Sequence, residues 1–148
     1  MLHVGPEPID AAALLAHFTA GLSASGGVVS FTGVVRAEGG GVEALELEHY
    51  PGFTQARIAE RMAEVDGRYG LEASVVVHRV GRIAPGEAVV FVAAAAAHRR
   101  PAFEAVDQLM DYLKSAAPFW KKECAAAGAR WVEPQAQDHA DLERWDVR

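Results

Sequence analysis

One helical segment constrains the fold of this chain more than any other stretch, because a proline marks each of its ends. Pro101 is typical of the first turn of a helix, where the absent N–H would have no partner. Pro118 ends the segment, because the residue before a proline is disfavoured in the helical conformation. Apolar residues between the prolines recur every three or four positions: Phe103, Val106, Met110, Leu113 and Ala117. This spacing predicts a helix with one buried face.

Helix and strand patterns alternate along the rest of the chain. Asp10 predicts the start of a first helix, and a second helical pattern closes near Gly70. Strand patterns cover residues 28–36, 42–50, 71–80, 88–97 and, briefly, 130–133. The glycines at 39–41 predict a hairpin between the first two strands, and Gly33 predicts a bulge or a close backbone approach. This order favours an α+β fold with a mainly antiparallel sheet and helices packed on one face.

The length and charge limit the classes of protein that fit. A chain of 148 residues suits one domain, residues 1–148, with a polar C-terminal tail at 133–148. The net charge of −6 argues against broad binding to nucleic acid or to an anionic membrane. No stretch is long and apolar enough for a membrane span, and no signal peptide is expected. A single cysteine, Cys124, suits a reducing cytoplasm.

Two groups of basic residues are candidates for chemistry. His98, Arg99 and Arg100, the basic trio, lie where the free N–H groups of the helix that starts at Pro101 can hold an anion. Solvated charges at the end of a strand explain the same trio equally well. Arg36 ends another strand and is expected to be able to reach the same edge of the sheet.

The second group contains every lysine of the chain. Lys114, Lys121 and Lys122 fall within nine positions, against eleven arginines spread along the sequence. Lys114 lies on the flank of the apolar helical stripe, and the other two follow an expected aromatic turn, Pro118-Phe119-Trp120. Aromatic neighbours can desolvate an amine and lower its pKa. A lysine favoured by the helix dipole and a solvated loop pair remain the alternatives.

The cysteine and the histidines give weaker evidence for a catalytic or metal-binding site. Cys124 has no histidine beside it, so an incidental cysteine is favoured over a nucleophile. The histidines lack metal-ligand spacing, and His49 and His78 are expected to be packed or hydrogen-bonded. We expect no metal site and no cofactor. The chain contains neither a G-x-G-x-x-G motif nor a G-x-S-x-G motif.

Several short segments together resemble the catalytic (large) subunit of molybdopterin synthase. The matching pieces follow the family's order and cover roughly residues 27 to 133: FTGVVR at 31–36, LEHYPG at 47–52, VHRVG at 77–81, AHR at 97–99, MDYLK at 110–114, PFWKKE at 118–123 and RWVE at 130–133. One such segment would be weak evidence, but the ordered set of segments is specific to this family.

The resemblance implies a cytoplasmic sulfurtransferase with an α/β-hammerhead-like fold. Such enzymes convert cyclic pyranopterin monophosphate into molybdopterin by inserting two dithiolene sulfurs. The sulfur comes from the C-terminal Gly-Gly thiocarboxylate of a small ubiquitin-like partner subunit. Two large subunits form a homodimer within a heterotetramer. A non-catalytic dimeric module that binds an acidic peptide tail or a small anion is the competing class.

The resemblance also implies a pocket for two anions, the substrate phosphate and the spent carboxylate. The family's pocket corresponds to nine residues of this chain: Val34, Val35, Arg36, His98, Arg99, Lys114, Lys121, Lys122 and Glu123. Arg36, His98 and Arg99 are expected on the phosphate or pterin side. Lys114 and Lys121 are expected to be catalytic, as acid/base groups and oxyanion stabilisers.

Three positions depart from the family's pattern. Val34 stands where lysine is common, and Arg100 is expected to restore the missing cation. Gln135 stands where a basic residue is expected. These departures concern the details of phosphate contact.

Overall fold

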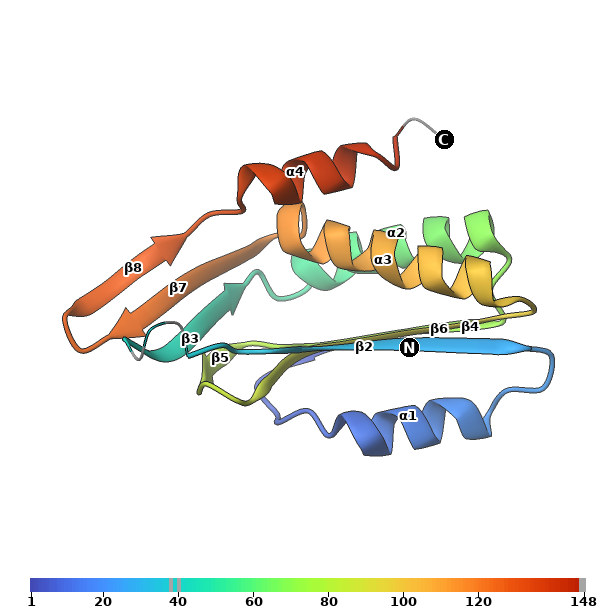
Figure 1. Cartoon of the computed structure of the whole chain (residues 1–148), viewed down its shortest axis with the longest axis horizontal. Helices are drawn as coiled ribbons and strands as arrows, with labels where there is room; N and C mark the ends of the chain where they lie inside the picture. Colours follow the sequence, from blue (N-terminus) through green and yellow to red (C-terminus); the bar gives the residue numbers. More distant parts are fainter. Residues whose placement is uncertain (38, 40, 147–148) are drawn as a thin grey trace.

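The computed structural model describes residues 1–37, 39 and 41–146. Two four-stranded sheets and four helices make up this part of the chain (Figure 1). In chain order the elements are β1 (Leu2–Gly5), α1 (Ala11–Ala20), β2 (Gly27–Val34), β3 (Val42–His49), α2 (Phe53–Tyr69), β4 (Ala73–Arg79), β5 (Gly81–Ile83), β6 (Ala88–Ala96), α3 (Arg99–Ser115), β7 (Phe119–Ala125), β8 (Gly128–Val132) and α4 (Ala136–Glu143).

The first sheet has the strand order β1-β4-β6-β2 and lies between helices (Figure 1). Only the β1–β4 pairing in it is parallel. On one face, α2 and α3 bury Ile58, Val65 and Leu109 against Val76 and Val92. On the other face, α1 packs against a second apolar cluster centred on the fully buried Phe91. The α+β class with mainly antiparallel pairing is confirmed, while α1 departs from the expected one-face arrangement of the helices.

Helix α3 begins and ends close to the predicted prolines, and four of the five residues of the predicted stripe contribute to its core: Val106, Met110, Leu113 and Ala117. Phe103 is 60% exposed, so its expected place in the core is wrong. The buried positions also include residues outside the stripe: Ala102, Ala105, Gln108, Leu109 and Tyr112. Their 3–4 spacing is that of a helix face. Alanines on this face allow α3 to approach β6 and β2, which the large Phe103 ring would prevent.

Strand pairing also differs from the sequence-based prediction. The expected hairpin between β2 and β3 is wrong, because β2 pairs with β6 and β3 pairs with β5 and β7. The expected glycine connection includes Glu38 and Gly40, which lie outside the described residues. Leu45 and Leu47 of β3 bury against Val35 and Ile83 in a separate core. This small core holds β3 in the second sheet, β5-β3-β7-β8.

The register of β2 confirms the prediction at Gly33. The pairing with β6 shifts between Gly33 and Val34, so a bulge lies at this point. A Cβ atom on Gly33 would lie 2.7 Å from Cγ1 of Val90. A side chain cannot be added at that distance unless the Val90 side chain shifts.

The segment after α3 contains more regular structure than predicted. The expected aromatic turn at residues 118–120 is wrong from Phe119 onward, because Phe119 opens strand β7. The predicted short strand at 130–133 is confirmed as β8. The polar tail, for which no element was predicted, contains α4, which lies over α3 (Figure 1). Within the described ranges, no helix has the length and apolar character that crossing a membrane requires.

Candidate active site

The fold separates the two predicted basic groups. The basic trio lies at the N-terminus of α3, exposed to solvent, and Lys114 lies in the last turn of the same helix. At 1.5 Å per residue, Arg99 and Lys114 are about 22 Å apart along the helix axis. His98 and Arg99 therefore do not share a pocket with Lys114 of the same chain.

Arg36 also lies far from the basic trio, so the expectation that it reaches the same sheet edge is wrong. The antiparallel register sets Gly27 opposite Ala96 and Val34 opposite Ala88. The two ends of β2 are about 23 Å apart at 3.3 Å per residue. The trio follows β6 near Gly27, and Arg36 follows Val34 at the other end. For the same reason Arg100 does not replace the cation missing at Val34 within one chain.

A cationic cluster forms where α3, β7 and the end of β2 meet. It consists of Arg36, Lys114 and Lys121, with two carboxylates among them, Glu123 and Asp138. Lys114 Nζ lies 3.1 Å from Asp138 Oδ1. The cluster joins residues of α3, β7 and α4, which follow one another in the chain, with Arg36, which comes from a distant part of the sequence.

Electrostatics within the cluster single out Lys121. Part of its side chain is open to solvent, yet desolvation of the ammonium group lowers the pKa of Lys121 below its ordinary value. The positive charge of Lys114 lowers this pKa further, and Arg36 acts in the same direction. Glu123 and Asp138 oppose the shift. Lys121 is therefore the lysine of the cluster that gives up its proton more readily than an ordinary lysine.

Strand alternation sends the two neighbouring lysines of β7 to opposite faces of the second sheet. Lys121 faces the cationic cluster, whereas Lys122 Nζ lies 5.0 Å from the ring centre of Trp131 on β8. A groove of about 430 Å³ lies beside Trp131 and is lined by Glu48, His49, Tyr50, Trp120 and Trp131. Lys122 therefore does not join the cluster of its own chain.

The remaining predicted residues occupy different settings. Val35 is buried in the small core beside Ile83, so its side chain offers no open surface to a ligand. Val34 is exposed at the end of β2. Glu123 accepts two hydrogen bonds from Arg130 of β8, at 2.9 and 3.1 Å. Arg130 and Asp138 were missed as members of this region, because their partners come from other strands and helices.

Cys124 lies on the opposite face of β7 from Lys121, with its Sγ atom 3.7 Å from a carboxylate oxygen of Glu46. We expect Cys124→Ser to retain the sulfur-transfer activity that the family resemblance implies, within about twofold, because the half-buried thiol faces away from Lys121. The check is a side-by-side rate measurement of both proteins in a molybdopterin-formation assay. An inactive, folded serine variant would assign the thiol a role.

His78 of β4 is packed and hydrogen-bonded, as predicted. Its ring stacks on Phe119 with centroids 4.1 Å apart, and its Nδ1–H donates to the Arg79 carbonyl at 2.9 Å. Burial lowers the pKa of His78 to about 4, and the nearby charge of Lys121 adds to this effect. The neutral ring is therefore the form that the folded protein holds.

This shift predicts an acid-sensitive fold. Between its unfolded pKa near 6.5 and its folded pKa of about 4, His78 binds more protons in the unfolded chain. Its contribution to stability is thus complete above pH 6.5 and is lost as the pH falls toward 4. The check is urea unfolding from pH 7.5 to 4 with wild type and His78→Gln. A wild-type profile no steeper than that of the variant would contradict the assignment.

The described residues contain no group of three or more histidine, cysteine, aspartate or glutamate side chains placed to hold a metal ion.

Comparisons with known proteins identify the family. The sequence model of a family described as "MoaE protein" matches residues 4–116. The chain is 56% identical over 140 residues to the molybdopterin synthase catalytic subunit of Caulobacter vibrioides, which covers 95% of this chain and 93% of the relative. This chain belongs to the MoaE family.

Solved structures agree with this assignment. The MoaE-family chain superposes on a molybdopterin biosynthesis MoaE protein from Burkholderia ambifaria with a TM-score of 0.85 at 40% identity, covering 100% of this chain and 99% of the other. It shares its fold with a chain from Helicobacter pylori, at a TM-score of 0.78 and 18% identity, covering 90% and 91%. That structure is described as a complex of subunits 1 and 2 of molybdopterin-converting factor.

Proposed function

We propose that this chain is the catalytic subunit of a molybdopterin synthase. The reaction is sulfur transfer to cyclic pyranopterin monophosphate, which produces the dithiolene of molybdopterin. Membership of the MoaE family supports the reaction class, and the cationic cluster supports the place where it occurs. The observation that carries the proposal is that Lys114 lies close enough to Lys121 to act on its charge. Desolvation and the positive charge of Lys114 both lower the pKa of Lys121.

The cluster suits the chemistry of a thiocarboxylate donor. When the donor carbonyl is attacked, negative charge develops on its oxygen, and fixed cations stabilise that charge best in a partly desolvated site. Lys121 can also move a proton at that step, because its pKa lies nearer to neutrality than that of an exposed lysine. Arg36 cannot lose its proton and suits a phosphate or carboxylate oxygen instead. These roles assign Lys114 and Lys121 to catalysis and Arg36 to anion binding.

The partner in this proposal is a small ubiquitin-like subunit with a C-terminal Gly-Gly thiocarboxylate. Its tail would enter the cationic cluster, where the spent carboxylate is also held. The H. pylori relative of the same fold is described in a two-subunit complex, which is consistent with such a partner. The cytoplasm, with its reducing conditions, is the compartment we propose.

A second copy of the chain completes the proposed pocket. His98 and Arg99 lie about 22 Å from Lys114 along α3, too far to hold the same substrate molecule. We therefore propose that these two residues, and Lys122, act on substrate bound mainly by the other copy in a homodimer. Glu123 lies within the cationic cluster of its own chain.

Reconstitution tests the proposed function directly. The purified chain is incubated with a thiocarboxylated ubiquitin-like partner and cyclic pyranopterin monophosphate, and molybdopterin is quantified. We expect product with the thiocarboxylated partner and none with the carboxylate form. Tight binding of the partner without product would favour the non-catalytic binding module, and absence of both would overturn the proposal.

A further inference from the structure

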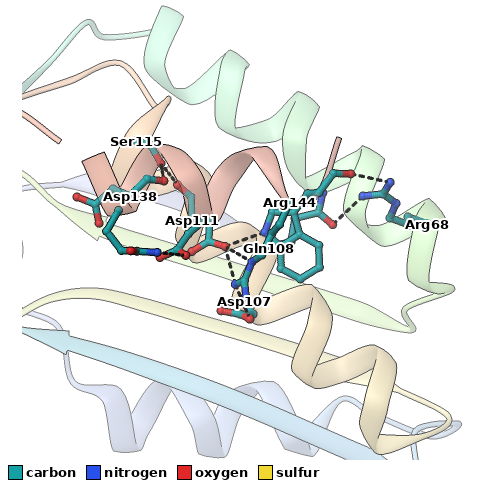
Figure 2. Close-up of polar contacts among 10 residues, drawn as sticks. Arg68, Asp107, Gln108, Asp111, Ser115, Asp138 and Arg144 are labelled. Atoms are coloured by element: carbon teal, nitrogen blue, oxygen red, sulfur yellow. Dashed lines mark hydrogen bonds and ion pairs between the residues drawn. The ribbon is translucent and has the colours of Figure 1, made fainter. Parts of the chain in front are cut away.

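The C-terminal helix α4 is attached to α3 by a set of charged contacts at its C-terminal end. Arg144 donates to Asp107 at 2.7 Å and to Asp111 at 2.8 Å (Figure 2). The indole Nε1–H of the buried Trp145 donates to the same Asp111 carboxylate at 2.7 Å. Arg68 of α2 donates to the Trp145 carbonyl at 3.2 Å. These contacts, which we call the α4 clamp, hold the end of the helix over two neighbouring helices.

The other end of α4 reaches the cationic cluster through one residue. Asp138 accepts the Gln135 N–H on Oδ2 at 2.8 Å, which caps the helix, and it pairs with Lys114 through Oδ1 at 3.1 Å. The Ser115 hydroxyl donates to the Asp138 carbonyl at 3.0 Å. The Asp138 side chain is 16% exposed, against 58% for Lys114. The carboxylate is thus the enclosed and fixed member of the pair, and the lysine is the mobile one.

Mobility is the reason that this contact matters. A lysine side chain has four rotatable bonds, and it loses much of its rotamer freedom when it is fixed. An ion pair with one partner so exposed adds little to the stability of the fold. It does, however, decide where the ammonium group of Lys114 is found. We propose that Asp138 is a positioning residue that holds Lys114 beside Lys121, and that the α4 clamp holds Asp138 in place.

This inference rests on the proposed function for its catalytic consequence, but its structural basis is independent. The charged and titratable groups that interact with Lys121 are Lys114 of α3, Asp138 of α4, Glu123 of β7, Arg36 after β2 and His78 of β4. The neighbouring strands β3 and β8 place the apolar Leu47 and Val132 opposite it. Asp138 raises the pKa of Lys121, opposing the larger effects of desolvation and Lys114. If loss of the Asp138 charge releases Lys114, the effect of Lys114, which is larger than that of Asp138, disappears as well, so the positioning role predicts a net rise in the pKa of Lys121.

The variant Asp138→Asn tests the positioning of Lys114 while the cap of helix α4 is retained. Asparagine keeps an oxygen for the Gln135 N–H and a similar shape, so α4 remains capped, but the charge that holds Lys114 is lost. We expect kcat for molybdopterin formation to fall about 10- to 100-fold, as misplacement of a reacting group does, with KM and partner affinity little changed. Asp138→Glu, which restores the charge, is expected to recover part of the rate.

The three lysines make a direct readout possible without turnover. In protein labelled with 13C at lysine Cε, only Lys114, Lys121 and Lys122 give signals. In Asp138→Asn we expect the Lys114 signal to narrow toward that of a freely rotating side chain, and Lys121 to titrate at higher pH than in wild type because the charge of Lys114 has moved away. A shift of Lys121 to lower pH would mean that Lys114 stays in place and would contradict the positioning role. A change in helix stability alone would move neither signal.

Matched variants test the contribution of the clamp. Asp141→Asn is the control, because it makes the same change at another carboxylate of α4. Among the described residues, Asp141 accepts a hydrogen bond only from Gln137 of the same helix. We expect this variant to leave the rate of molybdopterin formation and all three lysine signals unchanged. Arg144→Gln should shift the Lys121 titration in the same direction as Asp138→Asn. The double variant Asp138→Asn/Arg144→Gln should be no slower than Asp138→Asn alone, because both changes act through one contact.

The outcomes separate this inference from the proposed function. Unchanged lysine titrations and unchanged turnover in Asp138→Asn would overturn the positioning role. Additive losses in the double variant would overturn the link between clamp and carboxylate. If wild type forms no molybdopterin, the proposed function fails, while the lysine signals still decide whether Asp138 positions Lys114.

Discussion

Replacing Lys121 by alanine is expected to reduce molybdopterin formation by about 10²- to 10⁴-fold, the range that a positioned acid/base group contributes. Lys121 has a pKa lowered first by desolvation and then by the charge of Lys114, and it lies within the cationic cluster. The alanine variant loses both the charge and the transferable proton. Lys114→Ala is expected to reduce the rate similarly, because it removes the second cation of the pair. The measurement is the rate of product formation with saturating thiocarboxylated partner.

Two controls sharpen this prediction. Arg57→Ala removes an exposed cation on α2 that pairs with Glu60, and its rate should equal that of wild type. Lys121→Arg keeps a positive charge but cannot lose a proton, so it distinguishes electrostatic stabilisation from proton transfer. Folding and partner binding of each variant are verified by circular dichroism and calorimetry. Near-normal turnover of both Lys114→Ala and Lys121→Ala would remove the cluster from the mechanism.

Leu109→Ala is expected to destabilise the fold by about 2–5 kcal/mol, the usual cost of truncating a buried leucine. Leu109 is 0% exposed and belongs to the core between α3, α2 and the first sheet. Removal of its side chain leaves a cavity that the surrounding β-branched residues cannot readily fill. The measurement is the midpoint and slope of urea unfolding, at constant protein concentration.

Phe103→Ala is the matched control for Leu109→Ala. Both residues lie on α3, but Phe103 is 60% exposed, and its truncation should change the unfolding free energy by less than about 0.5 kcal/mol. The pair therefore tests which face of α3 is buried. A larger loss for Phe103→Ala than for Leu109→Ala would contradict the observed orientation of the helix.

Local sequence signals predicted the elements that depend on neighbouring residues alone. The Asp10 cap is confirmed by its hydrogen bond to the Ala13 N–H at 3.0 Å, and the bulge at Gly33 is confirmed by the shifted register. The helix between Pro101 and Pro118 is also confirmed, within the few residues by which such boundaries vary. Its buried stripe was predicted correctly at Val106, Met110, Leu113 and Ala117 but not at Phe103, because the small alanines that face the sheet were not counted.

Strand partners were less predictable. The alternation of apolar and charged residues in β3 places Leu45 and Leu47 on one face of the strand. It does not predict which strands pair with β3. A hairpin is the shortest connection, yet burial of Leu45 and Leu47 with Val35 and Ile83 stabilises a pairing with β5 and β7 instead. Such contacts join residues about 40 to 80 positions apart, and no local pattern encodes them.

The sequence by itself determined helices α1 to α3, strands β2, β3, β4, β6 and β8, and the family resemblance. It also placed His98 and Arg99 at one end of α3 and the three lysines near the other end. These features follow from backbone restrictions and side-chain periodicity, which act over a few residues. Only the tertiary structure decided that Arg36 joins Lys114 and Lys121 and that Lys122 faces away. It also decided that Asp138, in a tail without a predicted element, meets Lys114. The physical reason is that a site built across sheets and helices depends on which apolar faces are buried together, and that choice is made by the whole chain.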